Sequence, residues 1–177
     1  MDIARPLIII ITLAFFTFSI IEVMFLGMDH VAQAYVDDAI EEFVDDSCAS
    51  GYISPSKYLL MANRINNTGN LYDVKIQHDA KVMMPLIEGD TEVYGSYVTS
   101  VVTYNREEIL SEMFPLSSTE NNNYPLGTGD YLSVSLSLKS PTPAGRFIAF
   151  MTGREIKTIR YRYGATVGNF EENGMLK

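Results

Sequence analysis

Glu22 is the residue whose type and place in this sequence most demand a chemical explanation. It lies inside an apolar run, residues 6–28, that holds no other ionisable side chain. A carboxylate at the centre of a bilayer costs about 3 kcal/mol unless it is protonated, paired or in reach of water. We therefore expect Glu22 either to reach water near the outer end of the run or to pair with a basic group of a neighbouring subunit.

Clusters of metal-ligating residues give a weak signal. The acids between Asp37 and Asp46 do not follow the EF-hand pattern, so a solvated helix face is the favoured interpretation over a calcium site. His30 and His78 are far apart in the sequence and neither has a cysteine nearby, which argues against zinc. We expect no metal and no cofactor.

Motifs for catalysis are missing from the sequence. It contains no G-x-S-x-G, no H-E-x-x-H and no phosphate-binding glycine loop, and Gly127-x-Gly129 precedes an expected strand rather than a helix. The carboxylates in each of the pairs Glu107/Glu108 and Glu171/Glu172 are neighbours in the sequence, so they point to different sides of a helix or tail. We therefore predict that the protein is not an enzyme. Its net charge of −9 also argues against nucleic acid and anionic lipid as partners.

Two further features bear on assembly. Cys48 is the single cysteine, which leaves a choice between a free thiol and a disulfide between subunits. Arg160 and Arg162 belong to a basic group near the C-terminus, and we expect them to face the acidic helix of another copy. The other members of that group are Arg146, Arg154 and Lys157.

The element that carries Glu22 has the length of a membrane span. Residues 6–28 would form a helix of roughly 35 Å, enough to cross a hydrocarbon core of about 30 Å. Arg5 precedes the run, and no Lys or Arg follows it until Lys57. This bias predicts that residues 1–5 are cytoplasmic and that the C-terminal domain is extracytoplasmic. The alternative is a signal peptide cleaved after Ala34.

The helix is expected to continue beyond the span as an amphipathic segment, residues 29–46. Its apolar residues recur every three or four positions and alternate with acids. Such a stripe must be buried against the protein's own domain or against a neighbouring subunit. We assign the stripe to an assembly interface, with Val31, Tyr35, Ile40 and Phe43 as its members.

The remaining chain predicts an α+β fold, in which the long N-terminal helix packs on a small antiparallel sheet of three to four strands with short helices. The extracytoplasmic domain covers 47–167, and 168–177 reads as a flexible tail. Strands are expected at 71–78, 93–104 (a helix is the alternative there), 131–138 and 156–163. Helices are expected after Ser54-Pro55, Asn105 and Thr142-Pro143, and irregular segments at 85–91 and 115–130.

This layout resembles type IV pilin-like proteins. The segment AIEEFVDDSCASGYISPSKYLLMANRINNTGNLYDVKIQH is similar to the part after the anchor in minor-pilin-like (pseudopilin) proteins of Gram-positive tight-adherence (Flp-type) pilus systems. GDYLSVSLSLKSPTPAGRFIAFMTG, followed by RYRYGATV, is similar to their closing strand–helix–strand. The resemblance implies a non-catalytic subunit of a filament that a cytoplasmic ATPase and a membrane platform assemble. The chain has no short basic leader ending in Gly before the apolar run, which favours an unprocessed accessory or minor component.

We therefore expect a single-pass membrane protein that joins a type IV or tight-adherence pilus, or a related secretion apparatus, through its N-terminal helix. Its partners would be the lipid bilayer, further copies or other pilin-like subunits, and the pilus assembly platform. One alternative is a membrane-tethered adhesin or ligand-binding module that uses the 115–130 loop. A tethered hydrolase with a site that sequence motifs do not reveal is another alternative.

Overall fold

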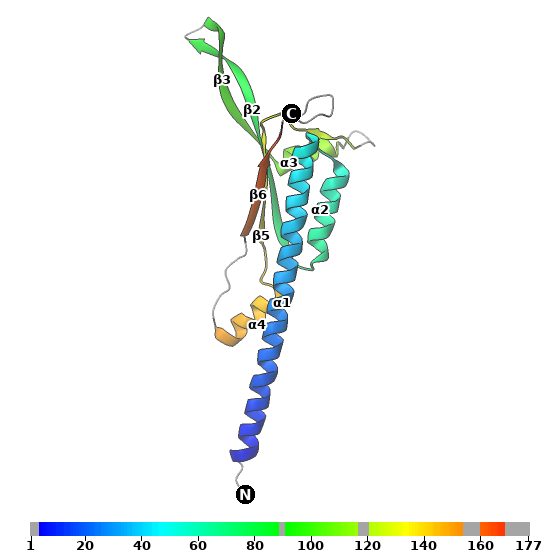
Figure 1. Cartoon of the computed structure of the whole chain (residues 1–177), viewed down its shortest axis with the longest axis vertical. Coiled ribbons are helices and arrows are strands. Elements are labelled where there is room, and N and C mark those ends of the chain that lie inside the picture. The colour runs from blue at the N-terminus through cyan, green and yellow to red at the C-terminus, as the bar shows by residue number, and fades with distance from the viewer. Residues whose placement is uncertain (1–3, 89–90, 117–120, 154–159, 169–177) are drawn as a thin grey trace.

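A single helix runs through most of the length of the molecule in the computed structural model, which describes residues 4–88, 91–116, 121–153 and 160–168 (Figure 1). This helix, α1 (Ala4–Ser50), has 47 residues, which corresponds to about 70 Å. Gly27 is its one interior glycine, and one glycine costs only about 1 kcal/mol in a helix. The helix ends where Gly51 adopts a positive φ of 73°.

A four-stranded antiparallel sheet lies beside the upper part of α1, residues 29–50. Its strand order is β3-β2-β5-β6, so consecutive β2 and β3 form a hairpin while β5 pairs with β2 and β6. The bounds are β2 (Tyr72–Glu88), β3 (Thr91–Asn105), β5 (Tyr131–Leu138) and β6 (Arg160–Thr166). The short strands β1 (Tyr52–Ile53) and β4 (Tyr124–Pro125) form a separate pair. The α+β layout with a small antiparallel sheet is confirmed.

Three short helices complete the domain, and their ends follow the capping signals of the sequence. In α2 (Pro55–Asn67) the Ser54 hydroxyl accepts the Lys57 N–H, and Arg64 lies in the last turn. In α3 (Arg106–Met113) the Asn105 N–H donates to the Glu108 carboxylate over 2.7 Å. In α4 (Pro143–Thr152) the Thr142 hydroxyl caps the first turn and Gly153 ends the helix at φ 65°.

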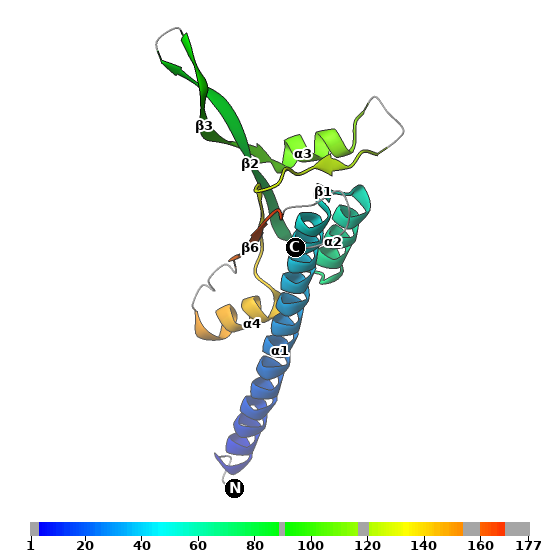
Figure 2. The ribbon, with the colours of Figure 1, turned by 45° about the horizontal axis from the view of Figure 1, so that its top comes forward.

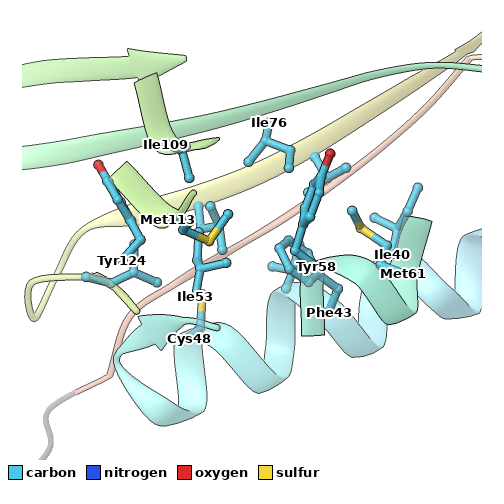
Figure 3. Packing of buried hydrophobic residues seen from close by; sticks show 14 of the residues in the cluster. Ile40, Phe43, Cys48, Ile53, Tyr58, Met61, Ile76, Ile109, Met113 and Tyr124 are labelled. Atoms are coloured by element: carbon cyan, nitrogen blue, oxygen red, sulfur yellow. The ribbon is translucent and has the colours of Figure 1, made fainter. Parts of the chain in front are cut away.

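The core lies between α1, α2 and α3 on one side and the inner face of the sheet on the other (Figures 2 and 3). Ile40 and Phe43 of α1 meet Met61 of α2, and Ile76 of β2 covers them from the sheet. These side chains are between 0 and 3% exposed. Burial of each large apolar side chain stabilises the fold by about 1.5–3 kcal/mol, so this cluster fixes the upper part of α1 to its domain.

Strand β2 is longer than the sequence predicts, and β3 is a strand throughout. Residues 85–88 were expected in a loop but continue β2, because a register shift between Pro85 and Ile87 accommodates the proline within the pairing to β3. The helix alternative for 93–104 is wrong, since residues 91–105 form strand β3, which pairs with β2 at 91–92 and 97–105. The start of the last strand at 156–159 and the tail beyond Gly168 lie outside the described residues.

Gly164 in β6 allows Tyr131 of the neighbouring strand to lie across it. A Cβ at this position would meet the Tyr131 ring and would lie 2.8 Å from the Cβ of Ser133. We expect Gly164→Ala to lower the free energy of unfolding by about 1–3 kcal/mol, the usual cost of overpacking. Urea denaturation of the full chain in detergent micelles measures this, with Gly168→Ala as the control, since no atom lies within 4 Å of that position. Equal stability of the two variants would contradict the expectation.

Candidate functional site

The lower part of α1, residues 5–28, makes few contacts with the rest of the protein. Its large apolar side chains are exposed, for example Ile9 at 67% and Phe16 at 66%. Thr12, Thr17 and Ser19 each donate their hydroxyl to the carbonyl four residues earlier, so these polar groups need no water. Among the described residues, α1 is the one helix long and apolar enough to cross a membrane.

The apolar stripe predicted on residues 29–46 is split between two faces of α1. Ile40 and Phe43 are 0% and 3% exposed within the chain's own core, whereas Val31 and Tyr35 are 71% and 44% exposed. Val31 and Ile40 are nine residues apart, about two and a half turns, so they face opposite directions. Each step of four residues advances 40° beyond a full turn, so a series of such steps passes from one face of the helix to another. The predicted interface role of Ile40 and Phe43 is therefore corrected to a core role.

Val31 and Tyr35 instead belong to a row of exposed apolar side chains that is turned away from the Ile40 side of α1, which packs into the core. Met24, Met28, Val31 and Tyr35 are separated by four, three and four residues and are 64, 65, 71 and 44% exposed. This spacing keeps all four within a narrow sector of the helix, as along a helix–helix seam. We call these four residues the outer seam. It begins within the apolar run, residues 6–28, and continues beyond the C-terminal end of that run.

Glu22 does not belong to the outer seam. It lies eighteen residues before Ile40, about five turns, and so on the side of α1 that faces the domain. There it lines a hollow of about 70 Å³ together with Phe18 of α1 and Phe147 and Met151 of α4. The structure therefore places Glu22 beside a helix of its own chain, away from the surface on which Val31 and Tyr35 lie.

The acidic face of α1 finds partners within its own chain. The Tyr161 hydroxyl donates to Glu41 over 2.5 Å and the Tyr163 hydroxyl donates to Asp45 over 3.0 Å. Arg64 pairs with Glu42, and burial together with the Glu41 hydrogen bond raises the pKa of Tyr161. The tyrosine therefore keeps its proton and remains a donor. These acids thus have intramolecular partners, which removes the main reason to expect a second copy's basic group on them.

Arg160 and Arg162 alternate with those tyrosines along β6 and therefore point to the other face of the sheet. Both are exposed, and the Arg162 guanidinium donates to the Ser133 hydroxyl over 3.2 Å. The two arginines lie away from α1 and from the outer seam. The structure thus separates them from the other residues that we assigned to one assembly interface.

Cys48 is part of the core. It is 5% exposed, its Sγ lies 3.5 Å from the Ala165 carbonyl oxygen, and the surrounding cluster includes Ile53 and Met113 (Figure 3). Burial, with a smaller contribution from the charge of Asp45, raises the pKa of the thiol to about 11. An intermolecular disulfide would require the thiol to leave the core, so the structure favours the free buried thiol of the two alternatives.

We therefore expect Cys48 to resist maleimide at pH 8 in the folded chain and to react fully in denaturant. A pKa of about 11 leaves about a hundredfold less thiolate than the ordinary value of 9.0, and burial adds a steric block. The control is Ala49→Cys in a Cys48→Ser background, because residue 49 is exposed. Comparable labelling of the two folded chains, or a disulfide-linked dimer of the native protein, would count against a buried thiol.

A buried polar network joins β2 to the segment before β5, and no sequence motif pointed to it. The His78 Nε2 lies 2.9 Å from the Asp130 carboxylate, and the His78 Nδ1 lies 2.9 Å from the Tyr124 hydroxyl. His78, Tyr124 and Asp130 are between 3 and 5% exposed. The Asp130 carboxylate also accepts the backbone N–H groups of Lys81 and Gly127 over 2.8 and 2.7 Å.

This network holds the loop rather than opening a reactive site. Burial raises the pKa of Asp130, but the hydrogen bonds from Lys81, His78 and Gly127 outweigh it and the net pKa is lowered. Burial also raises the pKa of Tyr124, which therefore keeps its proton. The described residues include no group of three or more His, Cys, Asp or Glu side chains that could hold a metal ion. We assign the network the role of fixing the 124–130 segment to the sheet.

A second exposed apolar region lies at the opposite end of the molecule from the apolar run of α1. Beyond their pairing with β5, strands β2 and β3 continue as a free two-stranded arm (Figures 1 and 2). We call this arm, residues 80–85 and 97–102, the hairpin arm. Its exposed apolar side chains lie on both faces and comprise Met83, Met84, Tyr97, Val98 and Val101. An isolated hairpin is marginally stable in water, so this surface is suited to a partner.

Comparison of the chain with protein-family models, with curated proteins and with solved structures found no match. The functional assignment therefore depends on the geometry described above.

Proposed function

We propose that the protein is a non-catalytic, membrane-anchored, pilin-like subunit or accessory component of a type IV or tight-adherence pilus, or of a related secretion apparatus. The observation that carries the proposal is the outer seam, Met24, Met28, Val31 and Tyr35, on a helix whose opposite side is already buried in the domain. A helix face that is apolar, exposed and continuous with a membrane span is suited to pack against a second helix.

The proposed membrane arrangement places the N-terminus in the cytoplasm and the domain outside. Arg5 lies at the cytoplasmic end of the span, and the acidic residues begin at its outer end with Asp29. The partners are the lipid bilayer, another copy or a related pilin-like subunit along the outer seam, and the platform that would insert the subunit into an assembly. Because the domain covers the Ile40 side of α1, the outer seam stays open to a neighbouring helix.

Cysteine crosslinking in native membranes tests this assembly. In a Cys48→Ser background, we expect Met28→Cys or Val31→Cys to give crosslinked dimers or larger products on oxidation, because neighbouring helices would place these positions close together. Leu59→Cys and Leu60→Cys on α2 are matched controls, since those positions are 47% and 51% exposed but lie off the seam. Monomers from the seam variants beside crosslinks from the α2 variants would rule out the outer seam as the interface.

A tethered adhesin or ligand-binding module remains the second candidate function. The hairpin arm favours it, because an exposed two-faced apolar surface lies at the end of the molecule farthest from the span (Figure 1). Of the 115–130 loop, residues 117–120 lie outside the described structure, and the 124–130 part is held by Asp130. Serine substitutions at Met83 and Tyr97 that abolish surface attachment, while seam crosslinks persist, would favour this candidate.

A further inference from the structure

Helix α4 packs on the part of α1 that forms the apolar run. The ring of Phe147 lies 6.1 Å from that of Phe18 and 5.9 Å from that of Phe25, centroid to centroid. At the beginning of α4, the Thr142 hydroxyl donates to the Asp29 carboxylate, which marks the outer end of the run. Figures 1 and 2 show α4 lying against α1 below the sheet, apart from the rest of the domain.

The level of these contacts places α4 below the outer surface of a bilayer. Phe18 lies ten residues before Met28, about 15 Å along the helix from the end of the apolar run. If the run crosses the membrane, a ring packed on Phe18 and Phe25 lies at the depth of the outer leaflet. The contact between Thr142 and Asp29, in turn, lies at the level of the headgroups.

The composition of α4 suits this depth. Phe150 and Met151 are 84% and 50% exposed, and within Pro143–Thr152 the single charged residue is Arg146, near the beginning of the helix. The chain as a whole carries 22 acidic residues, yet α4 carries none. Its ends are capped by the Thr142 hydroxyl, which accepts the Gly145 N–H, and by the Gly153 N–H, which donates to the Ala149 carbonyl.

We propose that α4 is a second membrane element, inserted into the outer leaflet beside α1 without crossing it, with lipid acyl chains covering Phe150 and Met151. A ten-residue helix is about 15 Å long and too short to span a bilayer. Continuity with the apolar run identifies the occupant as lipid, because the same bilayer that surrounds Phe18 and Phe25 surrounds the helix packed on them. This inference depends on the proposed membrane anchoring of α1.

Single-tryptophan variants test the proposal, since the chain contains no Trp. The full chain is reconstituted at low protein-to-lipid ratio in phosphatidylcholine vesicles with and without brominated acyl chains, which quench tryptophan on contact. Phe150→Trp reports on α4, Phe16→Trp on the span, and Tyr97→Trp on the hairpin arm. All three exchange one exposed aromatic residue for another, at 84, 66 and 68% exposure, so the fold is not disturbed.

We expect Phe150→Trp and Phe16→Trp to lose comparable large fractions of their emission in brominated vesicles, and Tyr97→Trp to be unaffected. Quenching of Phe16→Trp without quenching of Phe150→Trp would overturn the outer-leaflet position of α4 while leaving the anchor intact. An unquenched Phe16→Trp would overturn the anchor itself, and with it the position of α4. Quenching of all three variants alike would show contact without regard to depth and would also overturn the proposal.

Discussion

Replacing Asp130 by alanine is expected to remove about 3–5 kcal/mol from the free energy of unfolding, because each buried donor left without an acceptor costs about 1–3 kcal/mol. The substitution leaves the His78 Nε2 and the backbone N–H groups of Lys81 and Gly127 without their acceptor, and all three were satisfied by one carboxylate. Since a domain of this size is stable by about 5–15 kcal/mol, the variant should retain a fold of markedly lower denaturation midpoint.

Urea denaturation of the full chain in detergent micelles, followed by near-ultraviolet circular dichroism, measures this loss. Asp73→Ala is the matched control, because it lies on β2 beside a partner, Lys139, at 3.7 Å with both side chains substantially exposed. A surface pair of that kind contributes about 0–1 kcal/mol. Losses of similar size in the two variants would contradict the structural role of the Asp130 network.

The lowered pKa of Asp130 also predicts how pH changes the difference in stability between the wild type and Asp130→Ala. A carboxyl group whose pKa is lower in the folded state stabilises the fold above its unfolded value, about 3.9, and loses that contribution as the pH falls through the folded value. The stability difference between the wild type and Asp130→Ala should therefore be largest near neutral pH and should narrow below about pH 4. A difference that stays constant or widens on acidification would contradict this linkage.

The elements of the fold could be predicted because their signals are local. Ser54-Pro55 and Thr142-Pro143 begin helices in the structure as their side chains require, and the alternation in 131–138 gives β5. The extension of β2 to Glu88 could not be predicted in this way. It depends on pairing with β3, which lets a strand continue through Pro85.

The arrangement of the candidate surfaces was harder to predict, for two physical reasons. The apolar stripe on α1 was predicted from residue spacing alone. Each four-residue step advances 40° beyond a full turn, so the predicted stripe from Val31 to Phe43 covers two faces of the helix. The His78–Tyr124–Asp130 network joins residues that are 46 and 52 positions apart, so only the pairing of β2 with β5 brings them together. Likewise, nothing local indicates that Phe147 packs on Phe18.

Removing the lower part of α1 is expected to have the largest effect of any change in this chain, because it would abolish membrane association. More than ten large apolar side chains between Leu7 and Met28 are exposed on the helix. At about 1.5–3 kcal/mol for each side chain transferred from water to hydrocarbon, the anchor contributes on the order of 20 kcal/mol. A free energy of that size makes insertion effectively irreversible, whereas among the described side chains of α4 only Phe150 and Met151 are large, apolar and exposed.

Extraction of membranes with alkaline carbonate, applied to the full chain and to a chain lacking residues 1–28, is therefore the most direct test. The account predicts that the full chain stays in the membrane pellet, and that the shortened chain appears in the soluble fraction with its core folded, as judged by a Cys48 thiol still protected from maleimide. Release of the full chain by carbonate would show that residues 5–28 do not span a membrane and would contradict the account.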